Sequence, residues 1–141
     1  MSLLPAKIVC DTNTLVSGFL WKGNGYHLLS KILERKAVLF ASPVLLSEFA
    51  RVLEYPKLRP FIPNPAELTG KLESIAVFVE PKEKVEIIKE DPDDNKVLEC
   101  GLAAGADFIV SGDNHLLKLR AFKGIPIITT NAALERICNR P

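Results

Sequence analysis

Four acidic residues stand at positions where their side chains could perform chemistry. Asp11 and Asp113 each follow a short apolar run, and Glu48 and Asp94 lie on the apolar faces of two expected helices. An acid on a burying face must have a partner, because an unpaired buried charge costs several kcal/mol. If the four carboxylates meet, they repel one another and raise one another's pKa values unless cations lie between them.

Hard divalent cations suit such a site. An all-oxygen ligand set without thiol or imidazole groups favours Mg²⁺ or Mn²⁺. A carboxylate-bound pair of these ions activates water and stabilises the oxyanions of an in-line displacement at phosphorus. The sequence shows no Ser/His/Asp or Cys/His arrangement, and His27 and His115 are isolated along the chain. The residues therefore favour phosphodiester hydrolysis in which the four acids are catalytic. The expected metal ligands are Asp11, Asp94 and Asp113.

The segment from residue 90 to residue 113 organises this expected site. Asp91 is expected to cap a helix whose first residue is Pro92, and Gly105 to end it in a left-handed conformation. Asp94 lies three residues before Val97, on the stripe that must be buried. A short apolar strand and an exit turn to Asp113 follow, so this one unit delivers two of the carboxylates.

Glu48 belongs to another expected helix, which Ser42 and Pro43 begin as cap and first residue. Glu48 lies four residues before Val52 on the apolar face of this helix, so it points toward the core or the rim of a cleft. A salt bridge to a neighbouring base such as Arg51 is the alternative.

The other acids also have simpler structural alternatives. Asp11 could be a turn residue at a strand end, and Asp113 could cap a short helix over residues 114–119. Asp91 and Asp93 are best interpreted as helix-start charges, which the exposed N–H groups of a first turn favour.

Five short apolar segments separated by helical patterns predict the fold. These segments span residues 7–10, 37–41, 75–79, 108–110 and 125–129. The pattern is typical of a three-layer α/β/α sandwich with a central, mainly parallel five-stranded sheet. Pro126 should place the last strand at a sheet edge. Ligands bind beyond the carboxyl ends of such strands where the winding reverses, so Asp11 and Asp113 converge if the first and fourth strands are neighbours.

The composition is that of one ordinary globular domain over residues 1–141, with 48% hydrophobic and 25% charged residues. The net charge is +1, and gathering four acids in one site would leave a mildly basic exterior that suits a polyanion. Three unpaired cysteines argue against disulfides and favour a cytoplasmic location. No apolar run approaches the length of a membrane span. The charged connection at residues 81–90 is expected to be a mobile flap over Asp94.

Four motifs together resemble one known family. They are Asp-Thr-Asn at residues 11–13, Ser-Pro-Val-Leu-Leu-Ser-Glu-Phe at residues 42–49, Asp-Pro-Asp-Asp-Asn-Lys-Val-Leu-Glu at residues 91–99, and Ile-Val-Ser-Gly-Asp at residues 109–113. Nearly the whole chain resembles the PIN-domain ribonucleases, especially the VapC-type toxins of toxin-antitoxin pairs.

This resemblance implies a metal-dependent endoribonuclease that leaves a 5′-phosphate and uses the acidic quartet of Asp11, Glu48, Asp94 and Asp113. It also implies that Asn13 and Ser111 orient the quartet, that RNA is the substrate, that an antitoxin protein is a partner, and that the chain forms homodimers. His115 departs from the pattern, because many relatives carry a further acid there.

Two other functions are open. Asp11-Thr12-Asn13-Thr14 is similar to the Asp-x-Asp-x-Thr opening of haloacid-dehalogenase-type phosphatases, but Asn13 replaces the second acid and thereby removes the general acid. The other alternative is a catalytically silent module of the same fold that binds RNA or protein. The presence of all four acids argues against a module without catalytic activity.

Overall fold

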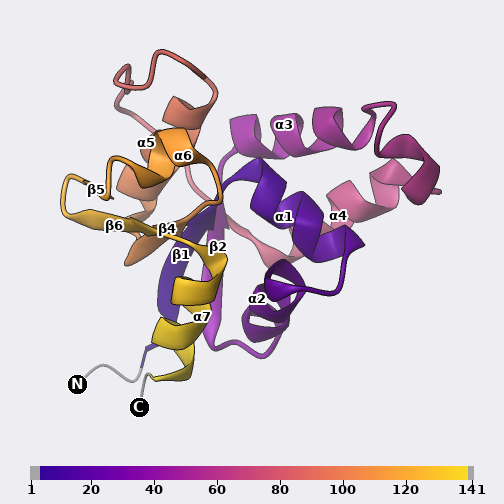
Figure 1. Cartoon of the computed structure of the whole chain (residues 1–141), viewed down its shortest axis with the longest axis horizontal. Coiled ribbons are helices and arrows are strands. Elements are labelled where there is room, and N and C mark those ends of the chain that lie inside the picture. The colour runs from indigo at the N-terminus through magenta and orange to yellow at the C-terminus, as the bar shows by residue number, and fades with distance from the viewer. Residues whose placement is uncertain (1–3, 140–141) are drawn as a thin grey trace.

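A six-stranded sheet lies between two layers of helices in the computed structural model, which describes residues 4–139 (Figure 1). The sheet order is β3-β2-β1-β4-β6-β5, and the neighbours are parallel except for the antiparallel pair β5 and β6. This confirms the α/β/α sandwich with a mainly parallel sheet, although the expected number of five strands is wrong. The strands are β1 (Ala6–Cys10), β2 (Ala37–Ala41), β3 (Val77–Phe78), β4 (Phe108–Val110), β5 (Ala121–Phe122) and β6 (Ile125–Ile128).

The additional strand is β5, whose two residues carry too short a pattern to be recognised in the sequence. It pairs Ala121 with Pro126 of β6, so β6 is not at the sheet edge as the proline had suggested. Pro126 is tolerated there because β4 pairs with β6 from Ile127 onward. The missing proline N–H is therefore not required by the β4 ladder.

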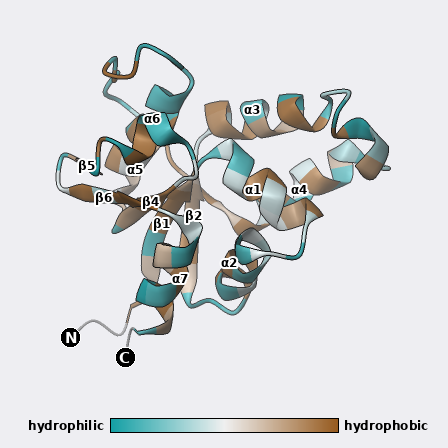
Figure 2. Cartoon of the chain, viewed as in Figure 1, coloured by the Kyte–Doolittle hydropathy of each residue, from teal (hydrophilic) through white to brown (hydrophobic). Residues whose placement is uncertain are grey.

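Helices cover both faces of the sheet. They are α1 (Thr12–Leu20), α2 (Asn24–Leu33), α3 (Pro43–Leu53), α4 (Pro65–Ile75), α5 (Asp94–Ala104), α6 (Asn114–Leu117) and α7 (Thr130–Cys138), with a 3₁₀ turn at Arg59–Phe61. Ile8 and Cys10 of β1 pack in a cluster with α1 to α4 and α7, whereas Val9 packs with α5 and α6. This alternation is that of a strand buried on both faces. Figure 2 shows hydrophobic colouring on the strands β4 and β6 and on parts of the helices that cover the sheet.

Helix α5 lies close against the sheet. A Cβ atom at Gly101 would lie 2.7 Å from Cδ1 of Ile109 on β4, so a larger residue at this crossing would require the Ile109 side chain to shift. Gly105 ends the helix with a φ of 60°, as predicted. The close approach fixes where the first turn of α5 stands relative to the carboxyl ends of the strands.

The start of α5 differs from the expectation. The helix begins at Asp94, not at Pro92. Asp91 instead forms a turn in which its carboxylate accepts a hydrogen bond from the Asp93 N–H at 3.2 Å, and its carbonyl accepts one from the Asp94 N–H at 3.0 Å. An Asp side chain often forms such a turn with the backbone two residues on. The turn keeps Asp94 in the first turn of the helix, on its buried side.

The connection at residues 81–90 is fixed on α5. Asn95 accepts a hydrogen bond from the Ile88 N–H at 2.9 Å and donates one to the Ile88 carbonyl at 2.8 Å. Glu99 accepts one from the Val85 N–H at 3.0 Å, and the side chains of Val85 and Ile88 are buried, whereas that of Ile87 is exposed. These contacts favour an ordered segment, and the mobility of the expected flap stays a prediction. No helix among the described residues has the length and apolarity that crossing a membrane requires.

Candidate active site

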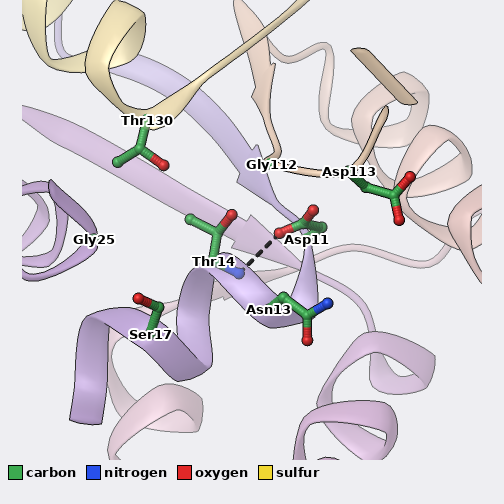
Figure 3. A pocket seen from close by; sticks show the side chains of 8 residues that line it. All are labelled: Asp11, Asn13, Thr14, Ser17, Gly25, Gly112, Asp113 and Thr130. Atoms are coloured by element: carbon green, nitrogen blue, oxygen red, sulfur yellow. Dashed lines mark hydrogen bonds between the residues drawn. The ribbon is translucent and has the colours of Figure 1, made fainter. Parts of the chain in front are cut away.

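The strands β1 and β4 are neighbours, and the winding of the sheet reverses between them. Cys10 pairs with Val110, so Asp11 and Ser111 leave the sheet side by side. The Asp11 N–H donates to the Val110 carbonyl at 3.0 Å. Asp11 also caps α1, since its Oδ1 accepts a hydrogen bond from the Thr14 N–H at 2.9 Å (Figure 3). The first strand end thus holds a carboxylate in a fixed position.

Ser111 links Asp11 to Asp113. Its side chain is fully buried, and its hydroxyl donates to Oδ2 of Asp11. The same hydroxyl accepts a hydrogen bond from the Asp113 N–H at 2.9 Å. Asp113 caps α6, with its Oδ1 accepting from the His115 N–H at 2.7 Å. The two acids at the strand ends are therefore positioned by one shared side chain.

Asp94 approaches these residues from α5. It is 8% exposed, and its Oδ2 has no hydrogen-bond partner among the described residues. Burial raises the pKa of Asp94 to about 7, and the charges of Asp113, Asp91, Asp11 and Glu48 add to the increase. A buried polar atom without a partner is costly, so this oxygen marks a place where a ligand would bind.

Glu48 enters from α3 and is half-buried. Burial and the charge of Asp93 raise the pKa of Glu48, while a hydrogen bond from the Thr12 hydroxyl lowers it. Arg51 forms its ion pair with Asp93, at 3.4 Å, so the alternative of a salt bridge from Glu48 to Arg51 is not seen. Sequence reasoning missed Thr12, although it lies next to Asp11.

His115 also lies in the cluster, although it was not among the predicted metal ligands. Ligand atoms of Asp94, Asp113 and His115 lie within 4.8 Å of one another. His115 is isolated along the chain, but the family resemblance places it where many relatives carry a further acid, and this was one signal. Its spacing was another, because a residue two positions after Asp113 in the first turn of a helix is folded back toward the helix cap.

Hollows flank the acids on two sides. One has a volume of about 400 Å³ and is lined by Asp11, Asn13, Thr14, Ser17, Gly25, Gly112, Asp113 and Thr130. In Figure 3, Asp11 lies between Thr14 and Asp113. The other has a volume of about 260 Å³ and is lined by Pro43, Val44, Ser47, Glu48, Arg51 and Asp93. The Asn13 amide forms no hydrogen bond with an acid among residues 4–139, whereas Ser111 holds two of them.

The chemistry of these donors fits a divalent cation. The site offers carboxylate oxygens, one of which is buried without a partner, and a cation between them would offset the repulsion that raises the pKa of Asp94. Oxygen ligands suit Mg²⁺ and Mn²⁺, and Mn²⁺ also accepts an imidazole. The arrangement can therefore bind a cation close to a hollow that is open to substrate.

Comparison with known proteins identifies the family. A sequence profile of the PIN domain matches residues 7–115, so the chain belongs to the PIN domain family, whose members are in general metal-dependent nucleases. It is 31% identical over 125 residues, 85% of this chain and 79% of the relative, to the uncharacterized protein MJ1680 of Methanocaldococcus jannaschii. The crystal structure of PAE2754 from Pyrobaculum aerophilum is similar with a TM-score of 0.63 and 16% identity, covering 96% of this chain and 91% of that one.

This family membership leaves the phosphatase interpretation without support. The structural likeness at 16% identity concerns the fold alone.

Proposed function

We propose that this protein is a metal-dependent endoribonuclease that hydrolyses RNA phosphodiester bonds. The observation that carries the proposal is the carboxylate of Asp94, which is buried, raised in pKa to about 7 and left with one unpartnered oxygen among three other acids. A structural carboxylate would be paired with a base or with backbone N–H groups. A carboxylate that binds a cation instead needs an oxygen without a protein partner, as Oδ2 of Asp94 is.

Three acids would hold the ions, and each has a distinct support. Asp11 is held by Ser111 and the start of α1, Asp113 by the backbone of α6, and Asp94 by its place in the first turn of α5. Bound ions of this kind supply a water of lowered pKa and stabilise the oxyanions of the displacement, as in two-metal nucleases. Ser111 acts as a positioning residue, and Asn13 is proposed to orient the quartet or the substrate from the rim of the larger hollow.

Glu48 is proposed to be the fourth catalytic acid. It lies at the junction between the acids and the smaller hollow, where it can accept the proton of the attacking water. Hydrolysis then adds the water oxygen to phosphorus and breaks the bond to the 3′ oxygen. The products are a 3′-hydroxyl and a 5′-phosphate.

The hollows on both sides of the acids support a single-stranded substrate. A strand that crosses the site would occupy the hydroxyl-lined hollow beside Thr14 on one side and the hollow beside Arg51 on the other. Arg51 is more than half exposed and so can reach a phosphate as well as Asp93. RNA as the substrate is supported by the family.

Cleavage of mixed RNAs by the purified protein tests the proposal. Mn²⁺ or Mg²⁺ should support cleavage, EDTA should abolish it, and Asp11→Asn should lower the rate at least about 100-fold because a metal ligand is lost. Glu73→Gln, on the exposed face of α4, is the control and should keep the full rate. The proposal is wrong if the protein hydrolyses a generic phosphomonoester but no RNA, or if Asp11→Asn retains the RNA cleavage.

We further propose that the nuclease is the toxin of a toxin-antitoxin pair and works as a homodimer with an antitoxin as partner. The support is the resemblance of the motifs to VapC-type toxins. Induced expression of the wild type should stop growth, whereas Asp94→Asn should not. Growth unaffected by an active wild-type enzyme would contradict the toxin role without touching the nuclease activity.

A further inference from the structure

Two side-chain atoms in the site are buried and lack a hydrogen-bond partner among the described residues. They are Oδ2 of Asp94 and Nδ1 of His115. Such atoms are rare in folded proteins, and each calls for a ligand or a proton. These two atoms lie on different elements, α5 and α6, yet their residues both belong to a group that offers ligand atoms within 4.8 Å of one another.

The spacing of this group suits one ion. Atoms that bind the same ion by bonds of about 2.1 Å lie at most about 4.2 Å apart. Ligand atoms already within 4.8 Å of one another reach such distances by small side-chain rotations. The hydrogen bond from the His115 N–H to the Asp113 carboxylate, at 2.7 Å, already holds these two residues next to each other. Metal binding therefore requires no rearrangement of the backbone between them.

The imidazole of His115 turns its buried nitrogen toward the carboxylate of Asp113. Nδ1 lies 3.5 Å from Oδ1 of Asp113, which is near enough for electrostatic contact but too long for a good hydrogen bond. In the tautomer whose Nδ1 carries no proton, the nitrogen lone pair faces the Asp113 carboxylate and is repelled by it. A cation between the three side chains removes this repulsion and satisfies both unpartnered atoms at once.

We propose that His115 supplies a nitrogen ligand through Nδ1, together with Asp94 and Asp113, and that the centre therefore prefers Mn²⁺ or a later divalent transition metal to Mg²⁺. The inference rests on the proposed function only in assuming that the acids bind cations. Imidazole binds transition metals well, whereas Mg²⁺ strongly prefers oxygen. The histidine thus changes which ion this particular chain selects.

Electron spin echo spectroscopy of the intact protein with Mn²⁺ tests the inference without any activity measurement. The wild type should show modulation from a directly bound nitrogen, and labelling the histidines with ¹⁵N should change the pattern. His115→Asn should abolish this signal and weaken Mn²⁺ binding at least about tenfold, as the loss of groups at metal sites does. His27→Asn, which alters the exposed histidine on α2, is the matched control and should keep both.

A second variant tests the metal preference. His115→Asp restores an all-oxygen set, so the ratio of Mn²⁺ affinity to Mg²⁺ affinity should fall about tenfold or more in isothermal titration. The inference is overturned if wild type bound to Mn²⁺ shows no histidine nitrogen, or if His115→Asn binds Mn²⁺ as tightly as the His27→Asn control. RNA cleavage that continues in either case would leave the nuclease proposal standing. Conversely, a histidine signal in a protein that cleaves no RNA would support the metal ligand and refute the nuclease.

Discussion

The hydroxyl group of Ser111 is hydrogen-bonded to Asp11 across two neighbouring strands, although the residues are a hundred positions apart. The same oxygen accepts the Asp113 N–H, so one small buried side chain fixes the separation of two proposed metal ligands. The link adds to the hydrogen bonds by which the Thr14 N–H holds Asp11 and the His115 N–H holds Asp113. Ser111 should therefore matter both to the stability of the fold and to metal binding.

The Ser111→Ala variant tests this role. It removes a buried hydrogen bond to a charged group and leaves Oδ2 of Asp11 without its donor, so the free energy of unfolding should fall by about 1–3 kcal/mol. Urea unfolding in EDTA measures this change. Ser74→Ala is the control, because its hydroxyl bonds only to the Lys71 carbonyl on the exposed α4, and it should cost less than about 0.5 kcal/mol. Equal costs in the two variants would contradict the role of Ser111.

The pKa of Asp94 makes the stability of the metal-free protein depend on pH. This pKa is about 7 in the folded protein, above the ordinary value of 3.8. The folded state therefore holds the proton more tightly, and stability falls as the pH rises from about 4 to above 7. A decrease of roughly 2–4 kcal/mol is expected between pH 5 and pH 8 in EDTA. The raised pKa of Glu48 acts in the same direction.

The Asp94→Asn variant separates the contribution of Asp94 to the pH dependence of stability from that of the other titratable groups. An amide does not titrate, so the variant should be more stable than wild type at pH 8 and should show a flatter pH dependence. Urea unfolding at both pH values in EDTA provides the measurement. A variant with the slope of the wild type would show that the pH dependence arises elsewhere.

Glu48→Gln should lower RNA cleavage while it stabilises the metal-free fold. The variant removes a half-buried charge that Asp93 and Asp91 repel, so the melting temperature in EDTA should rise by a few degrees. Glu73→Gln is again the control and should leave the melting temperature unchanged. A metal-free Glu48→Gln variant that melts below wild type would refute the repulsion argument.

The two hydrogen bonds of Asn95 fix the connection at residues 81–90. Asn95→Ala should cost about 2–4 kcal/mol, because it leaves both the N–H and the carbonyl of Ile88 buried without a partner. Hydrogen exchange should accelerate at Ile88 and Val85 more than in the strands of the sheet. Unchanged exchange at Ile88 would show that the apolar contacts of the segment suffice.

The positions of Asp11, Asp94 and Glu48 near the site could be predicted from the sequence for physical reasons. Asp11 follows a strand buried on both faces, and such strands end at the ligand-binding edge of the sheet. Asp94 lies on the helical stripe of Val97, so its burial followed from helical spacing, and this spacing also selected it over Asp93. Glu48 lay on an apolar face in the same way.

Other features depend on contacts that no local pattern reveals. The strand β5 has two residues and exists because β6 offers it an edge. His115 joins the site through the fold of the turn after Asp113, and the segment at residues 81–90 is held by side chains of α5. In each case a partner distant in the sequence or a turn geometry determines the position, so residue type and spacing were not enough.

Anomalous diffraction from crystals grown with Mn²⁺ locates the cation directly. A Mn²⁺ peak should lie among the side chains of Asp94, Asp113 and His115, within reach of Asp11, and Asp94→Asn crystals grown in the same way should lose it. An ordered Mn²⁺ bound elsewhere on the protein, or an empty acidic cluster at saturating Mn²⁺, would contradict a shared metal centre at these strand ends.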